Sequence, residues 1–366
     1  MSLFKAVDLA NTGVRTLSPY QAGKPIEEVE RELGITNIVK LASNENPLGL
    51  SPKVKAALQD TLAGLARYPD ANGFYLKSKL AAKHQVATSQ ITLGNGSNDV
   101  LELVARTYVN ADHEVIFAQH AFVVYPLVTQ AIGAKGIAVP AKNYGHDLPA
   151  MLRAITPRTR MIFIANPNNP TGTFLTSNEL YEFLQQVPTN VIVVLDEAYY
   201  EYVAEAERAP SITWLAEFPN LVVCRTFSKA YGLAGLRAGY AISHADIADY
   251  MNRVRQPFNM NSLSLKAAEV ALDDDEYLAE AIRINNLGMQ QLVEFCDCAK
   301  LPYIPSHGNF LTIEVGDKAA EVYQQLLQAG VIVRPVAGYE LPRHLRVSIG
   351  LKYENQAFID AMTALL

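Results

Sequence analysis

The middle of the chain alternates short apolar runs with longer segments of helical periodicity. Seven short runs rich in apolar residues lie at 91–93, 115–118, 136–139, 161–165, 191–195, 221–225 and 239–242. Several of them are continuously apolar, which is typical of strands that are covered on both faces. Segments 100–106 and 179–184 place apolar residues at helical spacing and predict crossover helices. The alternation predicts an α/β fold with a mostly parallel central sheet sandwiched by helices.

The pattern changes from about residue 264. A long helical stretch, 265–295, contains the acidic step 273–276 and precedes fewer strands. Those strands are expected at 310–314, 331–333 and 345–349, with a helix at 319–329 and Gly330 where a helix C-cap belongs. The first 40 residues hold one clear helix, 26–33. We therefore predict an N-terminal arm (1–45) that joins a small α+β domain (264–366), and a large domain (46–263) between them.

Composition limits the class of protein. The 366 residues are 49% apolar and 19% charged, which suits about two domains at roughly 100–200 residues each. The net charge of −6, without a basic block, argues against a nucleic-acid partner. The longest uncharged, mainly apolar stretch, 121–134, is broken by Pro126 and is shorter than the roughly 20 residues of a membrane span.

Three cysteines are too few for a disulfide framework and indicate a reducing compartment. Cys296 and Cys298 form a C-x-C pair without a second ligand pair, so two ordinary thiols are favoured over a zinc site. The N-terminus acquires Asp8 before any apolar run develops, unlike a secretory signal. We expect a soluble cytoplasmic protein with no metal and no membrane partner.

A glycine-containing turn follows the first of the central strands. Residues 94–99 open a helix, whose backbone N–H groups form an anion site that would include Gly96, Ser97 and Asn98. The turn is not a dinucleotide fingerprint, because the third glycine position holds Asp99 and the next acid, Glu114, precedes a strand. A phosphate cradle is favoured over a plain strand-to-helix turn.

Two charged residues lie at the ends of later strands. Asp196 follows five apolar residues, and taken alone it would be an ordinary turn or cap residue. Lys229 follows another strand, next to Ser228 and eight residues before Arg237. A buried lysine with a lowered pKa forms a Schiff base with an aldehyde, whereas most lysines are simply solvated. Ser228 and Arg237 would hold a phosphate by charge-assisted hydrogen bonds.

These features together fit pyridoxal 5′-phosphate. Lys229 would bind the aldehyde, and Asp196 would pair with the pyridine nitrogen and keep it protonated. Asn169 and Tyr199 would hydrogen-bond the ring hydroxyl, while Phe122 would lie on the ring face. We know of no other cofactor that needs this set.

Several motifs resemble those of the fold-type I pyridoxal-phosphate aminotransferases. These are Asn169-Pro-Thr-Gly, Asp196-Glu-Ala-Tyr, Ser228-Lys and Arg237. The chain is more closely similar to the histidinol-phosphate aminotransferase family, through motifs at 17–20, 41–49, 67–70, 94–97, 228–237, 333–336 and 345–350. The set spans nearly the full chain.

The resemblance implies roles by position. It makes Lys229 the Schiff-base lysine and Asp196 the pyridine partner, with Asn169 and Tyr199 on the ring hydroxyl. The positions that surround the cofactor phosphate fall on Ser97, Asn98, Thr226, Ser228 and Arg237. Two positions depart from the family: Phe122 replaces the frequent stacking Tyr, and Asn98 stands where many members carry an acid.

The resemblance also implies a homodimer and a substrate site. Tyr68 would reach the cofactor phosphate of the neighbouring subunit. Arg346 resembles the arginine that binds the substrate's anionic end, and Arg334 resembles a second anion-binding arginine. Tyr20 and Asn44 would border the substrate.

The implied reaction transfers an amino group reversibly between glutamate and imidazole-acetol phosphate, giving L-histidinol phosphate and 2-oxoglutarate. Lys229 would be the general base for the proton shift. Relatives that act on aromatic amino acids, or that decarboxylate a phosphorylated amino acid, share the pattern, so a broad aromatic aminotransferase is the alternative. A transcription regulator is disfavoured, because no DNA-binding module precedes the motifs. Acyl hydrolysis is also disfavoured, because 226–229 reads T-x-x-K rather than S-x-x-K.

Overall fold

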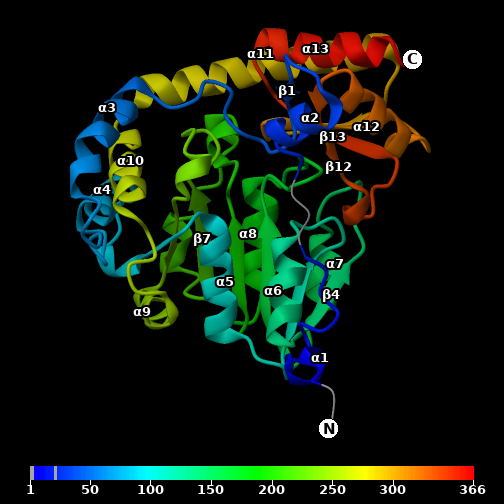
Figure 1. Ribbon diagram of the computed structural model, residues 1–366. Coiled ribbons are helices and arrows are strands. Elements are labelled where there is room, and N and C mark those ends of the chain that lie inside the picture. The colour runs from blue at the N-terminus through cyan, green and yellow to red at the C-terminus, as the bar shows by residue number, and fades with distance from the viewer. Residues whose placement is uncertain (1–3, 20–22) are drawn as a thin grey trace.

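A seven-stranded sheet forms the centre of the computed structural model, which describes residues 4–19 and 23–366 (Figure 1). In spatial order its strands are β2 (Ile91–Gly94), β8 (Gly239–Ser243), β7 (Leu221–Thr226), β6 (Ile192–Asp196), β5 (Thr159–Ala165), β3 (Glu114–Ala118) and β4 (Lys135–Val139). Neighbouring strands from β7 to β4 are parallel, and β8 is antiparallel to both of its neighbours. All seven apolar runs are strands, so the predicted mostly parallel sheet is confirmed.

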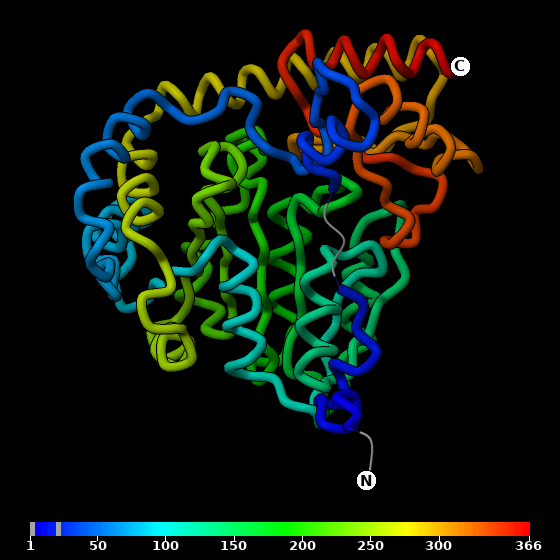
Figure 2. The backbone as a smooth tube through the Cα atoms, viewed as in Figure 1, coloured from blue at the N-terminus to red at the C-terminus, as the bar shows by residue number. Residues whose placement is uncertain are grey.

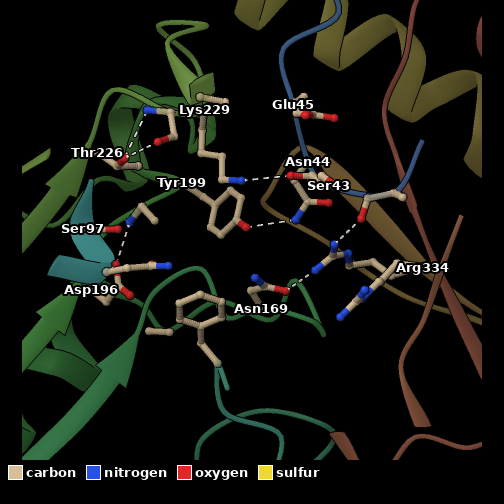
Figure 3. Close-up of a pocket in the computed structure, with 18 of the residues that line it drawn as sticks. Ser43, Asn44, Glu45, Ser97, Asn169, Asp196, Tyr199, Thr226, Lys229 and Arg334 are labelled. Atoms are coloured by element: carbon tan, nitrogen blue, oxygen red, sulfur yellow. Dashed lines mark hydrogen bonds between the residues drawn. The ribbon is translucent and has the colours of Figure 1, made fainter. Parts of the chain in front are cut away.

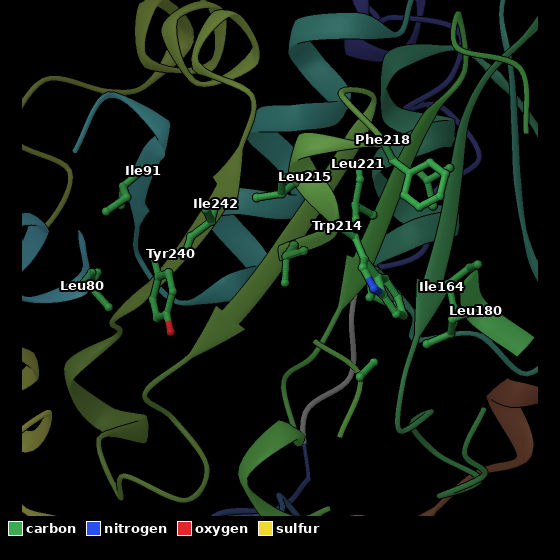
Figure 4. Packing of buried hydrophobic residues seen from close by; sticks show 14 of the residues in the cluster. Leu80, Ile91, Ile164, Leu180, Trp214, Leu215, Phe218, Leu221, Tyr240 and Ile242 are labelled. Atoms are coloured by element: carbon green, nitrogen blue, oxygen red, sulfur yellow. The ribbon is translucent and has the colours of Figure 1, made fainter. Parts of the chain in front are cut away.

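Helices cover both faces of this sheet. One face carries α5 (Ser97–Tyr108), α6 (Val124–Ile132) and α9 (Ala245–Val254). The other carries α3 (Pro52–Thr61), α4 (Phe74–His84), α7 (Leu148–Arg153), α8 (Ser177–Gln186) and α10 (Ser262–Ala271). Because strand side chains alternate between faces, Ile162 and Ile164 of β5 pack in one core cluster, and Met161 and Phe163 pack in the other. Figure 4 shows Ile164 beside Leu180 of α8.

A second group of elements joins the two ends of the chain. A four-stranded antiparallel sheet runs β12 (Arg334–Pro335), β13 (His344–Ser348), β10 (Phe310–Glu314) and β9 (Tyr303–Ile304). A further small sheet consists of two parallel strands, β1 (Val39–Lys40) and β11 (Val331–Ile332). Their helices are α2 (Ile26–Leu33), α11 (Asp275–Ala299), α12 (Ala319–Gln328) and α13 (Lys352–Thr363). Figure 2 shows the N-terminal segment reaching these C-terminal elements. Of the predicted strand at 331–333, residues 331–332 form β11, and the chain then enters a separate short strand, β12, in the other sheet.

Short elements complete the chain. They are α1 (Ala6–Leu9), which the sequence pattern did not reveal, and the 3₁₀ turns η1 (Leu62–Gly64), η2 (Thr88–Gln90), η3 (Tyr200–Tyr202), η4 (Glu205–Glu207), η5 (Thr213–Ala216), η6 (Ala234–Leu236) and η7 (Ala337–Tyr339). In the part of the chain that is described, no helix is both long enough and apolar enough to cross a membrane.

The predicted helix over 265–295 is interrupted at its acidic step. It ends as α10 at Ala271 and begins again as α11 at Asp275. Asp274, at the N-cap of α11, is buried, accepts a hydrogen bond from the Ser51 hydroxyl and pairs with Lys53 (Nζ–Oδ1 2.8 Å). An aspartate is favoured at a helix N-terminus, where its charge complements the helix dipole. The acidic step is therefore a helix boundary that anchors the start of α3.

Candidate active site

A cavity of about 360 Å³ lies at the carboxyl ends of the parallel strands. This is where open α/β sheets bind ligands, and the volume lies within the roughly 300–1,000 Å³ of small-molecule sites. Most of the predicted site residues line it: Asn44, Ser97, Asn98, Phe122, Asn169, Asp196, Tyr199, Thr226, Ser228, Lys229, Arg237, Arg334 and Arg346. In Figure 3, Asp196 and Ser97 lie at one end of the cavity and Arg334 at the other.

Asp196 is the last residue of β6 and is buried, at 4% exposure. Its Oδ2 accepts a hydrogen bond from the Tyr125 hydroxyl (2.8 Å), and its Oδ1 accepts one from the Ala198 N–H (3.2 Å). Burial raises the pKa of Asp196 to about 6, while the Tyr125 hydrogen bond acts in the opposite direction. A buried carboxylate that stays ionised near neutral pH is suited to a protonated ring nitrogen.

Lys229 follows β7 and is partly buried, with its amine inside the cavity. The Nζ donates a hydrogen bond to the Ser43 carbonyl (3.1 Å), and Figure 3 shows the amine turned toward Ser43 and Asn44. Burial, followed by the charge of Arg346, lowers the pKa of Lys229 to about 7. A substantial fraction of the amine is therefore neutral, and nucleophilic, at neutral pH.

Tyr199 is held by residues distant in sequence. Its hydroxyl accepts a hydrogen bond from Asn44 Nδ2 (2.9 Å), and burial raises its pKa to about 12. Asn44 is fixed in turn, because its N–H donates to Ser348 Oγ (2.7 Å) and its carbonyl accepts from Asn309 Nδ2 (3.0 Å). The phenol stays protonated and is positioned between the N-terminal segment and β6.

Asn169 and Arg346 form a pair across the cavity. Arg346 Nη1 donates to Asn169 Oδ1 (2.5 Å), and its Nη2 donates to the Ala42 carbonyl (2.7 Å). Asn169 precedes a cis peptide bond to Pro170, and a second cis bond joins Asn166 and Pro167. Arg346 is buried on β13, so its guanidinium presents a charge to the cavity.

A tight turn and a helix start form the phosphate cradle. Gly96 has φ +77°, and a Cβ on it would lie 2.6 Å from Arg237 Nη2. Arg237 also donates from Nη1 to Ser228 Oγ (3.3 Å), which accepts from Thr226 Oγ1 (3.0 Å). With Ser97 at the start of α5, the cradle gathers hydroxyls, a guanidinium and helix N–H groups. This donor set fits the phosphate of the predicted cofactor.

Two predicted residues, Gly96 and Tyr68, lie outside the cavity lining. Gly96 is directly behind the lining, against Arg237. Tyr68 is 83% exposed, and its ring stacks on Phe258 (centroids 4.7 Å apart). Tyr20 lies outside the described residues.

The cavity also contains groups that sequence reasoning missed. Glu45 and Tyr339 line it, and the Ser43 carbonyl accepts a hydrogen bond from Lys229. Behind the lining, the Tyr125 hydroxyl donates a hydrogen bond to Asp196. Glu45 lies inside the 41–49 motif, which was a usable signal. Tyr125 is only three residues after Phe122, but its contact with Asp196 at the end of β6 leaves no trace in the sequence.

The C-x-C pair does not form a ligand cluster in the structure. Cys296 is buried, Cys298 is exposed, and both are free thiols. Among residues 4–19 and 23–366, no group of three His, Cys, Asp or Glu side chains is placed to hold a metal ion.

Behind the cavity, the other face of the same strands carries a buried ion pair. Arg225 donates to Glu197 Oε2 from Nε (2.9 Å) and from Nη2 (2.8 Å). The Arg225 guanidinium also lies over the Tyr200 ring, 3.5 Å from its centroid. Because side chains alternate, Asp196 and Thr226 face the cavity while their neighbours Glu197 and Arg225 join the two strand ends from behind.

Comparisons with known proteins agree with this geometry. Residues 36–361 match the family model described as aminotransferase class I and II. The chain is 68% identical to histidinol-phosphate aminotransferase 1 of Idiomarina loihiensis, over 100% of both chains. It is 59% identical to histidinol-phosphate aminotransferase 2 of Pasteurella multocida, over 98% of this chain and 99% of that one.

Solved structures give the same architecture. The histidinol-phosphate aminotransferase of Sinorhizobium meliloti, in complex with pyridoxal-5′-phosphate, superposes with a TM-score of 0.90 at 26% identity, over 100% of both chains. A Thermus thermophilus aspartate aminotransferase mutant, at 22% identity, shares the fold with a TM-score of 0.84 over 97% of this chain and 99% of that one. The predicted fold-type I architecture is confirmed. The chain belongs to the class I and II aminotransferases and, within them, to the histidinol-phosphate aminotransferase family.

Proposed function

We propose that this enzyme transfers an amino group between L-histidinol phosphate and 2-oxoglutarate, giving imidazole-acetol phosphate and L-glutamate, with pyridoxal 5′-phosphate as cofactor. This is a step of histidine biosynthesis. The observation that carries the proposal is 68% identity over the full length to a histidinol-phosphate aminotransferase. The cavity supports it, since one pocket holds an amine of lowered pKa, a buried carboxylate and two arginines.

When bound, pyridoxal 5′-phosphate supplies an aldehyde that joins amines and a ring that accepts electrons. In the proposed arrangement Asp196 accepts a hydrogen bond from the ring nitrogen. Asn169 and Tyr199 would contact the ring hydroxyl, and Phe122 would cover the ring face. The residues proposed to hold the phosphate are Gly96, Ser97, Asn98, Thr226, Ser228 and Arg237.

Lys229 is the proposed catalytic base. Burial keeps much of its amine neutral near pH 7, so Nζ can take a proton from the substrate carbon and return it. Such a base contributes about 10²–10⁴-fold to the rate. Tyr199, with a pKa of about 12, keeps its proton throughout and acts as a hydrogen-bonding group.

Arg346 and Arg334 are the proposed binding groups for substrate anions. Glutamate carries two carboxylates and histidinol phosphate carries a phosphate ester, and guanidinium groups bind both by bidentate hydrogen bonds. Asn44 lines the same cavity. Tyr20, expected beside it, remains a prediction.

The substrate choice is tested by comparing kcat/KM for L-histidinol phosphate and L-phenylalanine, each with 2-oxoglutarate. We expect histidinol phosphate to be favoured by at least about tenfold, as one additional hydrogen bond to a charged group implies. The Lys229→Ala variant, which lacks the proposed catalytic base, gives the background rate. Equal values would contradict the proposal and support the aromatic aminotransferase, which the full-length relatives do not favour.

We also propose a homodimer in which Tyr68 reaches the neighbouring cavity. Its support is a set of exposed apolar side chains, unusual for a solvent-facing surface: Phe258, whose ring stacks on Tyr68, and Leu62, Leu65, Phe74 and Tyr75, which lie within seven residues of Tyr68 in the chain. The test is co-expression of a Tyr68→Ala chain with a Lys229→Ala chain. In a heterodimer, the Tyr68→Ala subunit keeps its own lysine and receives an intact partner tyrosine. We expect activity above that of either variant alone, whereas no recovery would contradict action between subunits.

We propose that the chain consists of an N-terminal arm (1–45), a large domain (46–263) and a small domain (264–366). It is supported by the pairing of β1 with β11 and by a separate core cluster around β10 and β13. Because α10 packs on the core of the large sheet, the break between α10 and α11 is a second candidate boundary. We place the enzyme in the cytoplasm, a reducing compartment that suits its three free cysteines.

A further inference from the structure

Tyr125 touches two of the groups proposed to contact the cofactor, although it does not line the cavity. The side chain lies on α6 and is fully buried. Its hydroxyl donates to Asp196 Oδ2 (2.8 Å), and its ring meets Phe122 edge-on, with centroids 5.9 Å apart and planes at 85°. Phe122 is the proposed stacking residue. One tyrosine therefore contacts both the carboxylate and the ring that would enclose the pyridine.

The position of the Tyr125 ring is fixed independently of any ligand. It stacks on Phe163 of β5, with centroids 4.5 Å apart and planes within 1°. Asp196 is aligned with Ala165 in the neighbouring β5 strand, and Phe163 lies on the same face of the sheet two residues before Ala165. This stack holds the hydroxyl at the end of β6, where it meets the carboxylate.

We propose that Tyr125 is a positioning residue for the cofactor ring: its hydroxyl keeps Asp196 ionised and oriented, and its ring supports Phe122. The inference rests on the proposed function, since it requires pyridoxal 5′-phosphate in this cavity.

The chemistry follows from the surroundings of Asp196. A carboxylate buried against apolar groups takes up a proton unless donors stabilise its charge. The Tyr125 hydroxyl and the Ala198 N–H each donate a hydrogen bond to the Asp196 carboxylate. The other titratable groups that act on it are Lys229, which favours the ionised form, and Glu197, which opposes it, with the buried Cys224 thiol nearby.

Tyr125 is a dependable donor. Burial raises its pKa well above the usual range, and the charge of Asp196 adds to this, so its hydroxyl keeps its proton. With both carboxylate oxygens held, the side chain cannot rotate freely, and its remaining acceptor capacity is directed at the cavity.

Tyr125→Phe removes the hydroxyl while keeping the ring stack. Asp196 then loses a donor, a larger fraction of it is protonated at neutral pH, and a protonated acid holds a ring N–H⁺ poorly. We expect the dissociation constant for pyridoxal 5′-phosphate to rise by about tenfold or more, the size of one lost hydrogen bond to a charged group. For the glutamate half-reaction, kcat falls while KM changes little, because no substrate contact is removed.

The spectroscopic readout separates this role from a packing role. The pH midpoint of the visible absorption of the bound cofactor shifts upward in Tyr125→Phe, because a less positive ring nitrogen withdraws less charge. Phe163→Leu, which removes the stack and keeps the hydroxyl itself, lowers stability and moves the midpoint less than Tyr125→Phe does. Tyr108→Phe is the matched control. Tyr108 is the last residue of α5, at the end of the helix away from the phosphate cradle, and it packs on the same core cluster, so we expect all readouts to stay unchanged.

The outcomes are distinguishable. Wild-type protein that binds no pyridoxal 5′-phosphate would contradict the proposed function and the inference with it. If the wild type binds the cofactor, and Tyr125→Phe has the wild-type dissociation constant and midpoint, the inference alone is overturned. A midpoint shift of equal size in Phe163→Leu would also overturn it, since packing would then be the cause.

Discussion

The buried Arg225–Glu197 pair offers a stability test of how the strand ends are held. Arg225→Met removes two hydrogen bonds, of 2.8 and 2.9 Å, and leaves Glu197 buried without its cation. Both side chains are at most 7% exposed, so solvent cannot compensate. Breaking a pair of this kind costs about 3–5 kcal/mol, whereas replacing both members by apolar residues of similar volume is often close to neutral. The double variant, with Met at both positions, is therefore expected to be more stable than either single variant.

The assay is guanidinium unfolding of the apo-protein, followed by the fluorescence of Trp214. This is the only tryptophan, and it packs in the core cluster on the Arg225 face of the large sheet. With m-values of about 2–6 kcal/mol per molar guanidinium, a loss of 4 kcal/mol lowers the midpoint by roughly 0.7–2 M.

A pH series gives the sign of the effect. Burial raises the pKa of Glu197, and without Arg225 the group folds best in its protonated form. Such a group stabilises below its unfolded pKa and loses that contribution as the pH rises. The deficit of Arg225→Met should therefore shrink as the pH falls toward about 4, close to the ordinary pKa of glutamate. Additive losses in the double variant, or a loss under about 1 kcal/mol in Arg225→Met, would refute the reasoning.

Three further predictions concern the cavity. Burial and Arg346 lower the pKa of Lys229 to about 7. The rate at which the apo-protein takes up pyridoxal 5′-phosphate should therefore rise with pH and level off just above pH 7. A rise that continues to pH 10 would indicate an ordinary lysine. Arg346→Lys cannot keep both hydrogen bonds of the guanidinium, so kcat/KM for glutamate should fall by at least about tenfold, mainly through a higher KM. The control Arg343→Lys, at an exposed position, should leave kcat/KM unchanged. Gly96→Ala forces a side chain into a positive-φ conformation that is almost exclusive to glycine, against a guanidinium, at a cost of about 1–3 kcal/mol. Cofactor affinity should drop, and affinity equal to that of Gly34→Ala, an exposed positive-φ control with nothing within 4 Å, would contradict the cradle.

The central sheet was predictable because its chemistry is local. A parallel strand covered on both faces must be apolar along its length, and 161–165 and 191–195 show this directly. Helix α6 was not among the predicted crossover helices, and its segment was considered only as an apolar stretch too short to span a membrane. Pro126 is the third residue of the helix, in the first turn, where proline costs no internal hydrogen bond.

The site was predictable only in outline. Strand ends meet at one edge of a parallel sheet, which is why Asp196 and Lys229 were expected in a common cavity, and both line it. The pairs that orient the site join distant segments: Asn44 with Tyr199, 155 residues apart, and Asn169 with Arg346, 177 residues apart. No local pattern encodes such contacts, and the role of Tyr125 depends on where α6 packs.

The most direct test of the account is to find which amine carries the cofactor. The purified protein, loaded with pyridoxal 5′-phosphate, is reduced with borohydride, digested, and the modified peptide identified by mass spectrometry. The account predicts a pyridoxyl-phosphate group on Lys229 alone, with none retained by Lys229→Ala. Modification spread over surface lysines, or an unmodified Lys229 peptide in an active preparation, would contradict it.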